Sequence, residues 1–346
     1  MSDIVAQIES AWIGGDWDTV LREGERWHHE VRAQGAHDPR PAFVLNTGYL
    51  FRGEMERAWS YHDQALQEEA DIETITAWLT QLREQHGENG FLHLITALCL
   101  SQCGRSEQSI DRFKRAIAAL PTLPHPHFFL GQIYERATRA DAAIKEFKEA
   151  VRLDPTFTPA RAALGLLYQA QGQLEMAVPQ FREVVKLTPD SAIAHCMLAS
   201  ALATQGKFEP ALKEYKEAVR LDPTNAELRY GLGRFYQDRG RIQLALHEFR
   251  EAVAADPGCS PAHAEIGWMQ LDNRDLIGAM ESFNRALRAD ENNARAYLGI
   301  AKLYATRGKR ESAWQNYQKA LKLEKDPQVR NTIMNELFME GGSWDV

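Results

Sequence analysis

Four histidines that share one position of a 34-residue period are the residues most able to bind a metal. They are His93, His127, His195 and His263, and His125 lies two residues before one of them. Neutral imidazole is a good ligand for zinc or haem iron. The sequence supplies no carboxylate or thiolate at matching spacing. We therefore expect no metal site and no cofactor, and interpret these histidines as polar residues at a helix interface.

The four cysteines give a weaker chemical signal. They are Cys99, Cys103, Cys196 and Cys259, and only the first two are close, in the run CLSQC of a helical pattern. This spacing indicates a metal site or disulfide only weakly, because a free cysteine usually packs as a small hydrophobic residue. We expect core positions for all four, which fits a reducing compartment such as the cytoplasm.

Catalysis finds no support in the sequence. There is no phosphate-binding loop, no GxSxG nucleophile elbow and no HExxH motif. The acidic residues are spread over helix surfaces, where solvation and pairing with residues one turn away explain them. No domain-sized segment remains outside the repeats to house an active site, so we expect a protein that is not an enzyme.

Composition and charge exclude several other classes. The 346 residues are 44% hydrophobic and 25% charged, which is typical of a soluble folded protein. The 40 basic and 48 acidic residues are dispersed, without the basic stripe that nucleic-acid binding needs. Asp3, Glu9, Asp16 and Asp18 interrupt the first 30 residues, which argues against a secretory signal. No window approaches 18 consecutive apolar residues, so we expect no membrane span and a cytoplasmic location.

From Gly90 onward the chain repeats every 34 residues, in seven blocks. Position 24 is always aromatic: Phe113, Phe147, Phe181, Tyr215, Phe249, Phe283 and Tyr317. Position 8 is always small: Ala97, Gly131, Gly165, Ala199, Gly233, Gly267 and Ala301. Position 20 is Ser109 and then alanine in six blocks, and position 32 is proline in the first five. Apolar residues spaced by 3, 4 and 7 predict two amphipathic helices in each block.

Each of these columns has a physical reason. Small residues at positions 8 and 20 let two helices approach closely, and the aromatic residue fills the gap between hairpins. The proline ends the second helix. Position 15 should accept a positive φ at the end of the first helix. The residues expected there are Gly104, Thr138, Gly172, Gly206, Gly240 and Gly308.

The columns resemble the tetratricopeptide repeat, whose signature is W-x2-L-G-x2-Y…A-x3-F…P. The residues that carry the resemblance are Leu130, Gly131, Tyr134, Ala143, Phe147, Ala150 and Pro155, with their equivalents in the six other blocks. It implies an all-α fold, an α-solenoid in which tandem helix-turn-helix hairpins form a right-handed superhelix. The departure is position 4, where the family favours tryptophan and this chain has His, Arg or Tyr.

The sequence predicts six segments along the chain. These are a divergent N-terminal helical hairpin (1–38), a tetratricopeptide-like repeat (39–71), an extra helix (72–89), seven tandem repeats (90–325), a C-terminal capping helix (326–339) and a flexible tail (340–346). Five of the eight tryptophans, Trp12, Trp17, Trp27, Trp59 and Trp78, lie in the first quarter. They indicate either a cap that fills irregular gaps with large side chains or a docking surface for a specific partner.

In the family, positions 2, 5, 9 and 12 of each first helix line the concave groove where peptides usually bind. In this chain the early part of that stripe is apolar and the later part mixes aromatic residues with cations. Tyr230 and Trp268 would pack a ligand side chain, and Glu227 and Glu265 would temper the positive field of the cations. The candidate partner-binding residues are Phe128, Gln132, Leu166, Ser200, Tyr230, Arg234, Trp268, Arg295, Leu298 and Lys302.

The resemblance therefore implies a non-catalytic scaffold, adaptor or chaperone-like regulator. Its groove would bind a protein or peptide, with an acidic-hydrophobic peptide as the specific hypothesis. The competing interpretation is that the groove charges only keep the surface soluble. The carboxylate clamp of heat-shock co-chaperones needs Lys at position 5 and Asn at position 9, and no block has that pair. Two alternatives stay open: a structural protein that self-associates, for example through residues 340–346, and a regulatory subunit that docks through its Trp-rich quarter.

Overall fold

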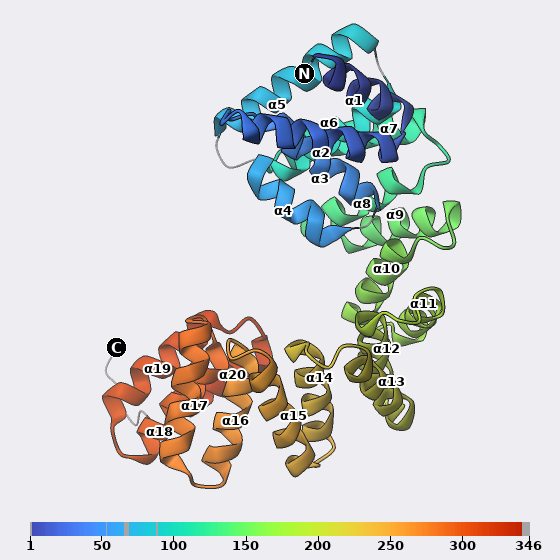
Figure 1. Cartoon of the computed structure of the whole chain (residues 1–346). Coiled ribbons are helices and arrows are strands. Elements are labelled where there is room, and N and C mark those ends of the chain that lie inside the picture. Colours follow the sequence, from blue (N-terminus) through green and yellow to red (C-terminus); the bar gives the residue numbers. More distant parts are fainter. Residues whose placement is uncertain (1, 53, 66–68, 88, 341–346) are drawn as a thin grey trace. The chain divides into compact units, whose positions relative to one another are not determined.

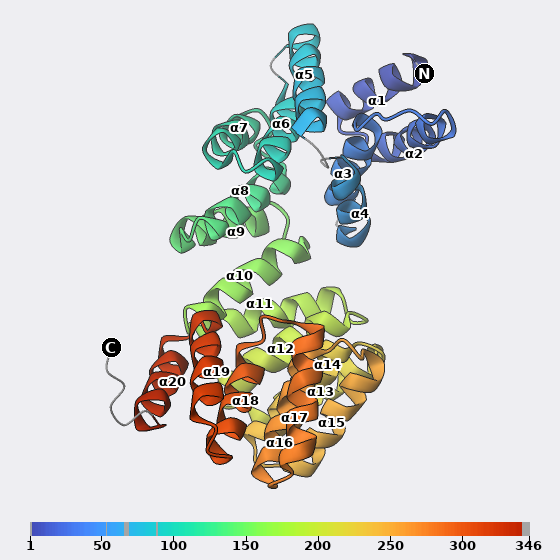
Figure 2. The same cartoon turned by 90° about the vertical axis from the view of Figure 1, so that its left-hand side faces the viewer.

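The computed structural model describes residues 2–52, 54–65, 69–87 and 89–340 (Figure 1). Within these residues the regular structure consists of α-helices, without a strand. The chain divides into two compact units, Met1–Gln180 and Phe181–Val346. Consecutive helices pair as antiparallel hairpins within each unit, which confirms the predicted all-α solenoid of tandem hairpins (Figure 2).

The helices are short and of similar length along most of the chain. The first unit holds α1 (Ser2–Gly14), α2 (Trp17–Ala33), α3 (Arg40–Arg52), α4 (Met55–Ala65), α5 (Glu69–His86), α6 (Gly90–Gln102), α7 (Ser106–Ala119), α8 (Pro124–Arg136), α9 (Ala140–Leu153) and α10 (Thr158–Ala170). The division falls within α11 (Leu174–Leu187). The second unit holds α12 (Ala192–Thr204), α13 (Phe208–Leu221), α14 (Ala226–Asp238), α15 (Ile242–Ala255), α16 (Ser260–Asp272), α17 (Leu276–Ala289), α18 (Ala294–Thr306), α19 (Arg310–Leu323) and α20 (Pro327–Glu340).

The turn inside each hairpin depends on one residue with a positive φ. Gly172 has φ 72° and Gly206 has φ 82°, and the other glycines expected at this position behave in the same way. Thr138 takes the same conformation at φ 57°, and the amide of Arg139 then donates to the carbonyl of Tyr134 at 2.8 Å. These turns confirm the prediction for position 15. Arg274 was not predicted at this position, which it fills in the sixth block with φ 62°.

The small residue at position 8 leaves room for the aromatic ring at position 24 of the same hairpin. A Cβ added to Gly131 would lie 2.6 Å from the ring of Phe147, and one added to Gly233 would lie 2.6 Å from the ring of Phe249. Real Cβ atoms do not approach carbon so closely, so the two helices can pack at this distance only with glycine. All seven aromatic residues at position 24 are buried.

The residue at position 4 connects three parts of the repeat in place of the family's tryptophan. The Nδ1 atom of His195 lies 2.6 Å from a carboxylate oxygen of Glu214 on the second helix of its own block. Its Nε2 atom lies 3.0 Å from the carbonyl oxygen of Pro189, at the end of the preceding hairpin. Arg229 makes the equivalent contacts, to Glu248 at 3.3 Å and to the Pro223 carbonyl at 2.9 Å. The polar side chain thus ties one hairpin to the next.

Three of the N-terminal tryptophans form a core rather than a surface. Trp12 and Trp27 are completely or almost completely buried, and Trp78 of α5 lies between them, with ring centroids 5.3 Å and 5.9 Å away. The indole N–H of Trp78 donates to Glu9 at 3.0 Å. Helix α5 lies where the extra helix is expected, and it packs against α6 without a pairing partner of its own. The side chain of Trp59 lies outside the described residues.

The last helix, α20, packs against α19 and covers the final hairpin. Asp326 begins it, because its carboxylate accepts a hydrogen bond from the Gln328 amide at 2.8 Å. Ile333 is buried in a cluster with Tyr317 and Ala301. The side chain of Phe338 and residues 341–346 of the predicted tail (340–346) lie outside the described part of the structure. Among the helices that the structure describes, none is long and apolar enough to cross a bilayer.

Candidate functional site

The apolar stripe expected on the early repeats is part of the interior of the first unit. Leu94 and Leu98 of α6 are buried, and Phe128 of α8 is only 8% exposed. Phe128 packs against Phe147 and Phe157, at 5.9 Å and 5.3 Å between ring centroids. These residues therefore do not offer an open apolar groove to a partner.

Aromatic residues of the N-terminal helices cover this stripe. Trp17 stacks on Phe51 at 3.8 Å and meets Phe91 edge-on at 5.9 Å. Phe51 in turn stacks on His125 at 4.9 Å. The sequence reasoning missed this arrangement because it needs contacts between residues more than 70 positions apart.

Gln132 and Leu166 are the other two candidates in the first unit. Gln132 is half-buried on α8, and Leu166 on α10 is 44% exposed, which is high for a leucine. The remaining seven candidates lie in the second unit, where the structure brings most of them together.

Ser200, Tyr230 and Arg234 line one hollow of about 370 Å³ between α12, α13 and α14. The guanidinium of Arg234 donates to the hydroxyl of Tyr230 at 3.2 Å. Phe208 and Arg239 line the same hollow, and the Arg239 guanidinium lies 3.6 Å from the centre of the Phe208 ring. The sequence reasoning named the first three residues and missed the last two, because they lie on the turn and the second helix.

A buried carboxylate on α16 contacts one cation of the preceding repeat and one of the following repeat. Glu265 on α16 is 0% exposed, and its Oε1 lies 2.6 Å from Nε of Arg295 on α18. The Arg234 guanidinium approaches the same oxygen at 3.7 Å, and the Gln237 amide donates to the other oxygen at 3.0 Å. The sequence reasoning expected Glu265 to temper the positive field, and the structure shows that it also positions the two guanidinium groups.

Trp268 lies between two cations. The Arg295 guanidinium is 5.3 Å and the Lys302 ammonium 5.2 Å from the centre of its ring, both within the range of cation–π attraction. The indole N–H donates to the Arg295 carbonyl at 3.2 Å and fixes the ring. We call Tyr230, Arg234, Trp268, Arg295 and Lys302 the cationic-aromatic groove; they come from α14, α16 and α18.

The positive charge of this groove is partly neutralised. Lys302 pairs with Glu336 of α20 at 2.8 Å. The three cations of the groove therefore have two carboxylate partners, those of Glu265 and Glu336. The side chains of Arg234 and Arg295 are still 43% and 48% exposed. A guanidinium has five N–H donors, so each can bind a further carboxylate at its exposed edge. Leu298 does not join the groove, because it packs in the cluster around Ile333 and Tyr317.

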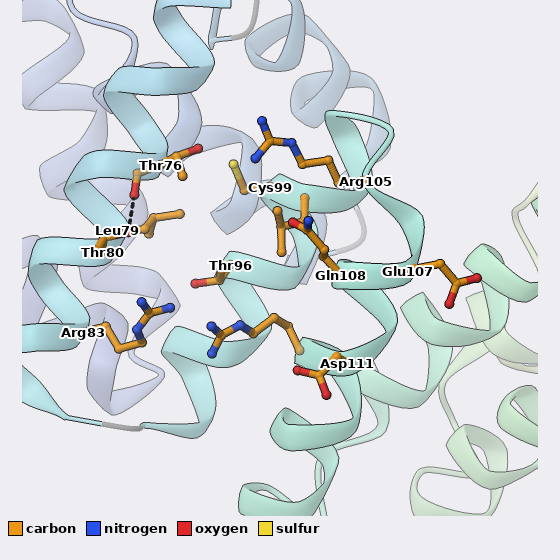
Figure 3. Close-up of a pocket in the computed structure, with 12 residues that line it drawn as sticks. Thr76, Leu79, Thr80, Arg83, Thr96, Cys99, Arg105, Glu107, Gln108 and Asp111 are labelled. Carbon is orange, nitrogen blue, oxygen red and sulfur yellow. Dashed lines mark hydrogen bonds between the residues drawn. The ribbon is translucent and has the colours of Figure 1, made fainter.

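One further cavity was not predicted from the sequence. It has a volume of about 510 Å³ and lies between α5, α6 and α7 of the first unit (Figure 3). In the part of the chain that the structure describes, no cluster of three or more His, Cys, Asp or Glu could hold a metal ion.

Family comparisons identify the repeat. Three family models described as tetratricopeptide repeat match the chain, one at residues 80–156 and 162–226, one at 202–266 and one at 294–327. Together these matches cover more than half of the sequence, and the chain belongs to the tetratricopeptide repeat family. Proteins of this family generally mediate protein–protein interaction and are generally non-catalytic scaffolds. No curated protein sequence matches the chain.

Solved structures show the same fold at low sequence identity. The chain is similar to yeast Tom70 (TM-score 0.62, 12% identity, 96% of this chain and 87% of that chain). It is also similar to a tetratricopeptide repeat protein from Parabacteroides merdae (TM-score 0.62, 15% identity, 71% and 97%). A third match is the APC/C hetero-tetramer Cut9–Hcn1 (TM-score 0.55, 16% identity, 96% and 68%). At these identities the likeness extends to the fold alone.

Proposed function

We propose that the protein is a non-catalytic scaffold that binds an acidic-hydrophobic segment of a partner protein in the cationic-aromatic groove. The observation that carries this proposal is that the cations of Arg295 and Lys302 lie 5.3 Å and 5.2 Å from the Trp268 ring, while Arg295 also pairs with the buried carboxylate of Glu265. It combines an apolar ring with exposed guanidinium donors in one place. Such groups are the usual anchors of a protein interface.

The groove contacts the ligand in two ways, one for a charged group and one for an apolar side chain. A carboxylate of the partner binds the exposed edges of Arg234 and Arg295, where charge-assisted hydrogen bonds are strong and directional. An apolar side chain next to it packs on the rings of Trp268 and Tyr230. Because Glu265 and Tyr230 already hold the guanidinium groups in place, binding orders few side chains and costs little entropy.

Lys302 has a different role, because its ammonium already pairs with Glu336. A partner carboxylate has to exchange with Glu336 before it contacts this lysine. The exchange makes the lysine contact weaker than the two arginine contacts, and it favours partners with more than one acidic residue. The interpretation that the cations only keep the surface soluble predicts no such preference.

A displayed peptide library tests the proposal. We expect the full chain to select peptides in which Asp or Glu alternates with Leu or Phe. The double variant Arg234→Ala/Lys302→Ala should bind a selected peptide at least about tenfold more weakly, since each charged hydrogen bond contributes about 1.5–3 kcal/mol. The matched control is Arg250→Ala/Lys322→Ala, which removes the same charges from exposed positions on the second helices α15 and α19. Equal affinity of the two double variants would contradict the proposal.

A further inference from the structure

The cavity between α5, α6 and α7 lies beside a helix that breaks the repeat pattern. Helix α5 (Glu69–His86) has no partner in a hairpin; it packs against α6, and a cavity of about 510 Å³ is lined by residues of α5, α6 and α7. This volume is within the range of pockets that bind small organic ligands. The cavity belongs to the first unit, and the cationic-aromatic groove belongs to the second.

Arginines from three places on the chain line this cavity. Arg83 comes from α5, Arg112 from α7, and Arg105 immediately precedes α7. Figure 3 shows the Arg83 side chain beside Thr96 and the Arg105 guanidinium extending toward Cys99. Arg112 is held by a contact of 3.3 Å to Nδ1 of His93. Three positive charges thus border a space that no side chain fills.

The carboxylates at the cavity wall are paired with other cations. Asp111 accepts a hydrogen bond from Nε of Arg115 at 3.0 Å, and Glu107 lies 3.5 Å from the guanidinium of Arg139 on the next hairpin. The Glu107 side chain points away from the cavity in Figure 3. Among the described residues, no carboxylate lies within ion-pair distance of Arg83 or Arg105. Glu73 and Glu84 of α5 line a neighbouring hollow, which shares Arg105, Thr76 and Thr80 with this cavity.

The rest of the lining is uncharged, and besides the Cys99 thiol and the Gln108 amide it consists of leucine and threonine side chains. Leu79 and Leu100 supply hydrocarbon surface, and Thr96 and Thr76 supply hydroxyls that can donate to an anion. A free inorganic anion would contact only one side of so large a space. A ligand with both an anionic group and an apolar part would use the whole lining.

We propose that this cavity binds an organic anion, a phosphate or carboxylate carried on a short apolar stem. The anionic group lies between Arg83 and Arg112 with the Thr96 hydroxyl nearby, and the stem packs on Leu79 and Leu100. This chemistry is found both in small metabolites and in a modified or acidic side chain of a protein. The site is independent of the proposed peptide groove, and neither depends on the other.

Isothermal titration of the full chain with phenyl phosphate and with phenylacetate tests this site directly. We expect at least one of the two to bind more tightly than inorganic phosphate, and the uncharged benzyl alcohol to show no binding. Binding should weaken as the salt concentration rises, because screening reduces the attraction of partly exposed charges. No binding by either aromatic anion would overturn the proposal.

Arginine variants locate the binding to the cavity. Arg83→Gln should weaken binding by about tenfold or more, the loss of one charged hydrogen bond. The matched control is Arg152→Gln on α9, because this exposed guanidinium pairs with Glu149 and does not line the cavity. If Arg112→Gln disturbs folding through its contact with His93, Arg83→Gln alone decides the question. Equal loss of affinity in Arg83→Gln and Arg152→Gln would show that only the general charge matters and would overturn the site.

A third experiment distinguishes a small molecule from a partner protein's side chain as the ligand that carries the anion. A short peptide with one phosphotyrosine carries the same phenyl phosphate group on a protein backbone. Tighter binding of the peptide than of phenyl phosphate points to a partner's side chain as the ligand. Binding that is equal or weaker points to a small molecule. Both results support the site, and each assigns its source.

Discussion

The guanidinium of Arg295 pairs with the fully buried carboxylate of Glu265, with Nε and Oε1 2.6 Å apart. The carboxylate would be costly to bury alone, and Arg234 lies too far away, at 3.7 Å, to replace this contact fully. The pair therefore stabilises the second unit as well as shaping the groove.

Arg295→Gln should lower the free energy of unfolding by about 1–3 kcal/mol, measured by urea denaturation. Breaking a fully buried pair costs more, but the Arg295 side chain is 48% exposed and solvent screens it. The double variant Glu265→Gln/Arg295→Gln should be more stable than Arg295→Gln, because it leaves no buried charge. Arg285→Gln, at an exposed position on α17, is the control. A double variant less stable than Arg295→Gln would contradict this account.

Gly233→Ala should destabilise the fold by about 1–2 kcal/mol. The new methyl group would lie 2.6 Å from the Phe249 ring, and overpacking of a core costs about 1–3 kcal/mol. The higher helix propensity of alanine returns up to about 1 kcal/mol. Thermal or urea unfolding measures the difference.

The control for this substitution is Gly14→Ala. A Cβ at Gly14 meets no atom within 4 Å, and its backbone does not need a positive φ. We expect it to be neutral or to stabilise the protein slightly. If both variants have the same effect, the close approach of the two helices is not what requires glycine at Gly233.

The columns at positions 8 and 24 could be predicted from the sequence because they report a contact inside a single hairpin. Gly131 and Phe147 lie 16 residues apart and recur as a pair, so one physical rule explains several blocks. The Arg274 turn escaped prediction because arginine rarely adopts a positive φ, and only the register of the neighbouring repeats forces it to do so.

The candidate site was predictable only in part, because it depends on contacts outside the repeat rule. Tyr230, Arg234 and Trp268 could be found from their position in the first helices. The pairing of Lys302 with Glu336 could not, because α20 lies after the last repeat and its orientation is not fixed by the 34-residue period. The burial of Phe128 and the cavity beside Arg83 likewise follow from how the irregular N-terminal helices fold back on α6 and α8.

Cys103 should be the most reactive cysteine of the protein. A hydrogen bond with Cys99 lowers the pKa of its thiol to about 7, and Arg105 adds to the effect. Burial raises the pKa values of Cys196 and Cys259. We expect iodoacetamide to modify Cys103 roughly tenfold faster than these two at pH 7, with a half-maximal rate near that pH. Mass spectrometry of the modified peptides between pH 5.5 and 9.5 measures this.

Two variants at Cys99 distinguish the hydrogen bond from the general environment. Cys99→Ala removes the donor and should move the half-maximal rate of Cys103 to a higher pH. Cys99→Ser retains a donor and should leave it closer to that of the unmodified protein. If the alanine and serine variants behave alike, the hydrogen bond does not set the reactivity.

His125 should make the protein less stable in mild acid. Its ring lies between Phe51 and Phe157, each at 4.9 Å, and burial lowers its pKa below the usual 6.5, although a contact with the Phe51 carbonyl opposes this. The unfolded chain therefore binds more protons than the folded chain in the range between the folded-state pKa and 6.5. Stability is fully present above about pH 6.5 and falls as the pH drops toward the folded-state pKa.

His125→Gln retains a side-chain N–H for the Phe51 carbonyl and removes the titrating group. Its unfolding free energy should fall less between pH 7 and pH 5 than that of the unmodified protein, as measured by urea denaturation at each pH. His247→Gln, at an exposed position on α15, should leave the pH dependence unchanged. Burial also lowers the pKa of His28, so part of the acid sensitivity should persist in His125→Gln and decrease further in the double variant His28→Gln/His125→Gln. A double variant with the same pH dependence as the unmodified protein would show that other groups carry the acid sensitivity.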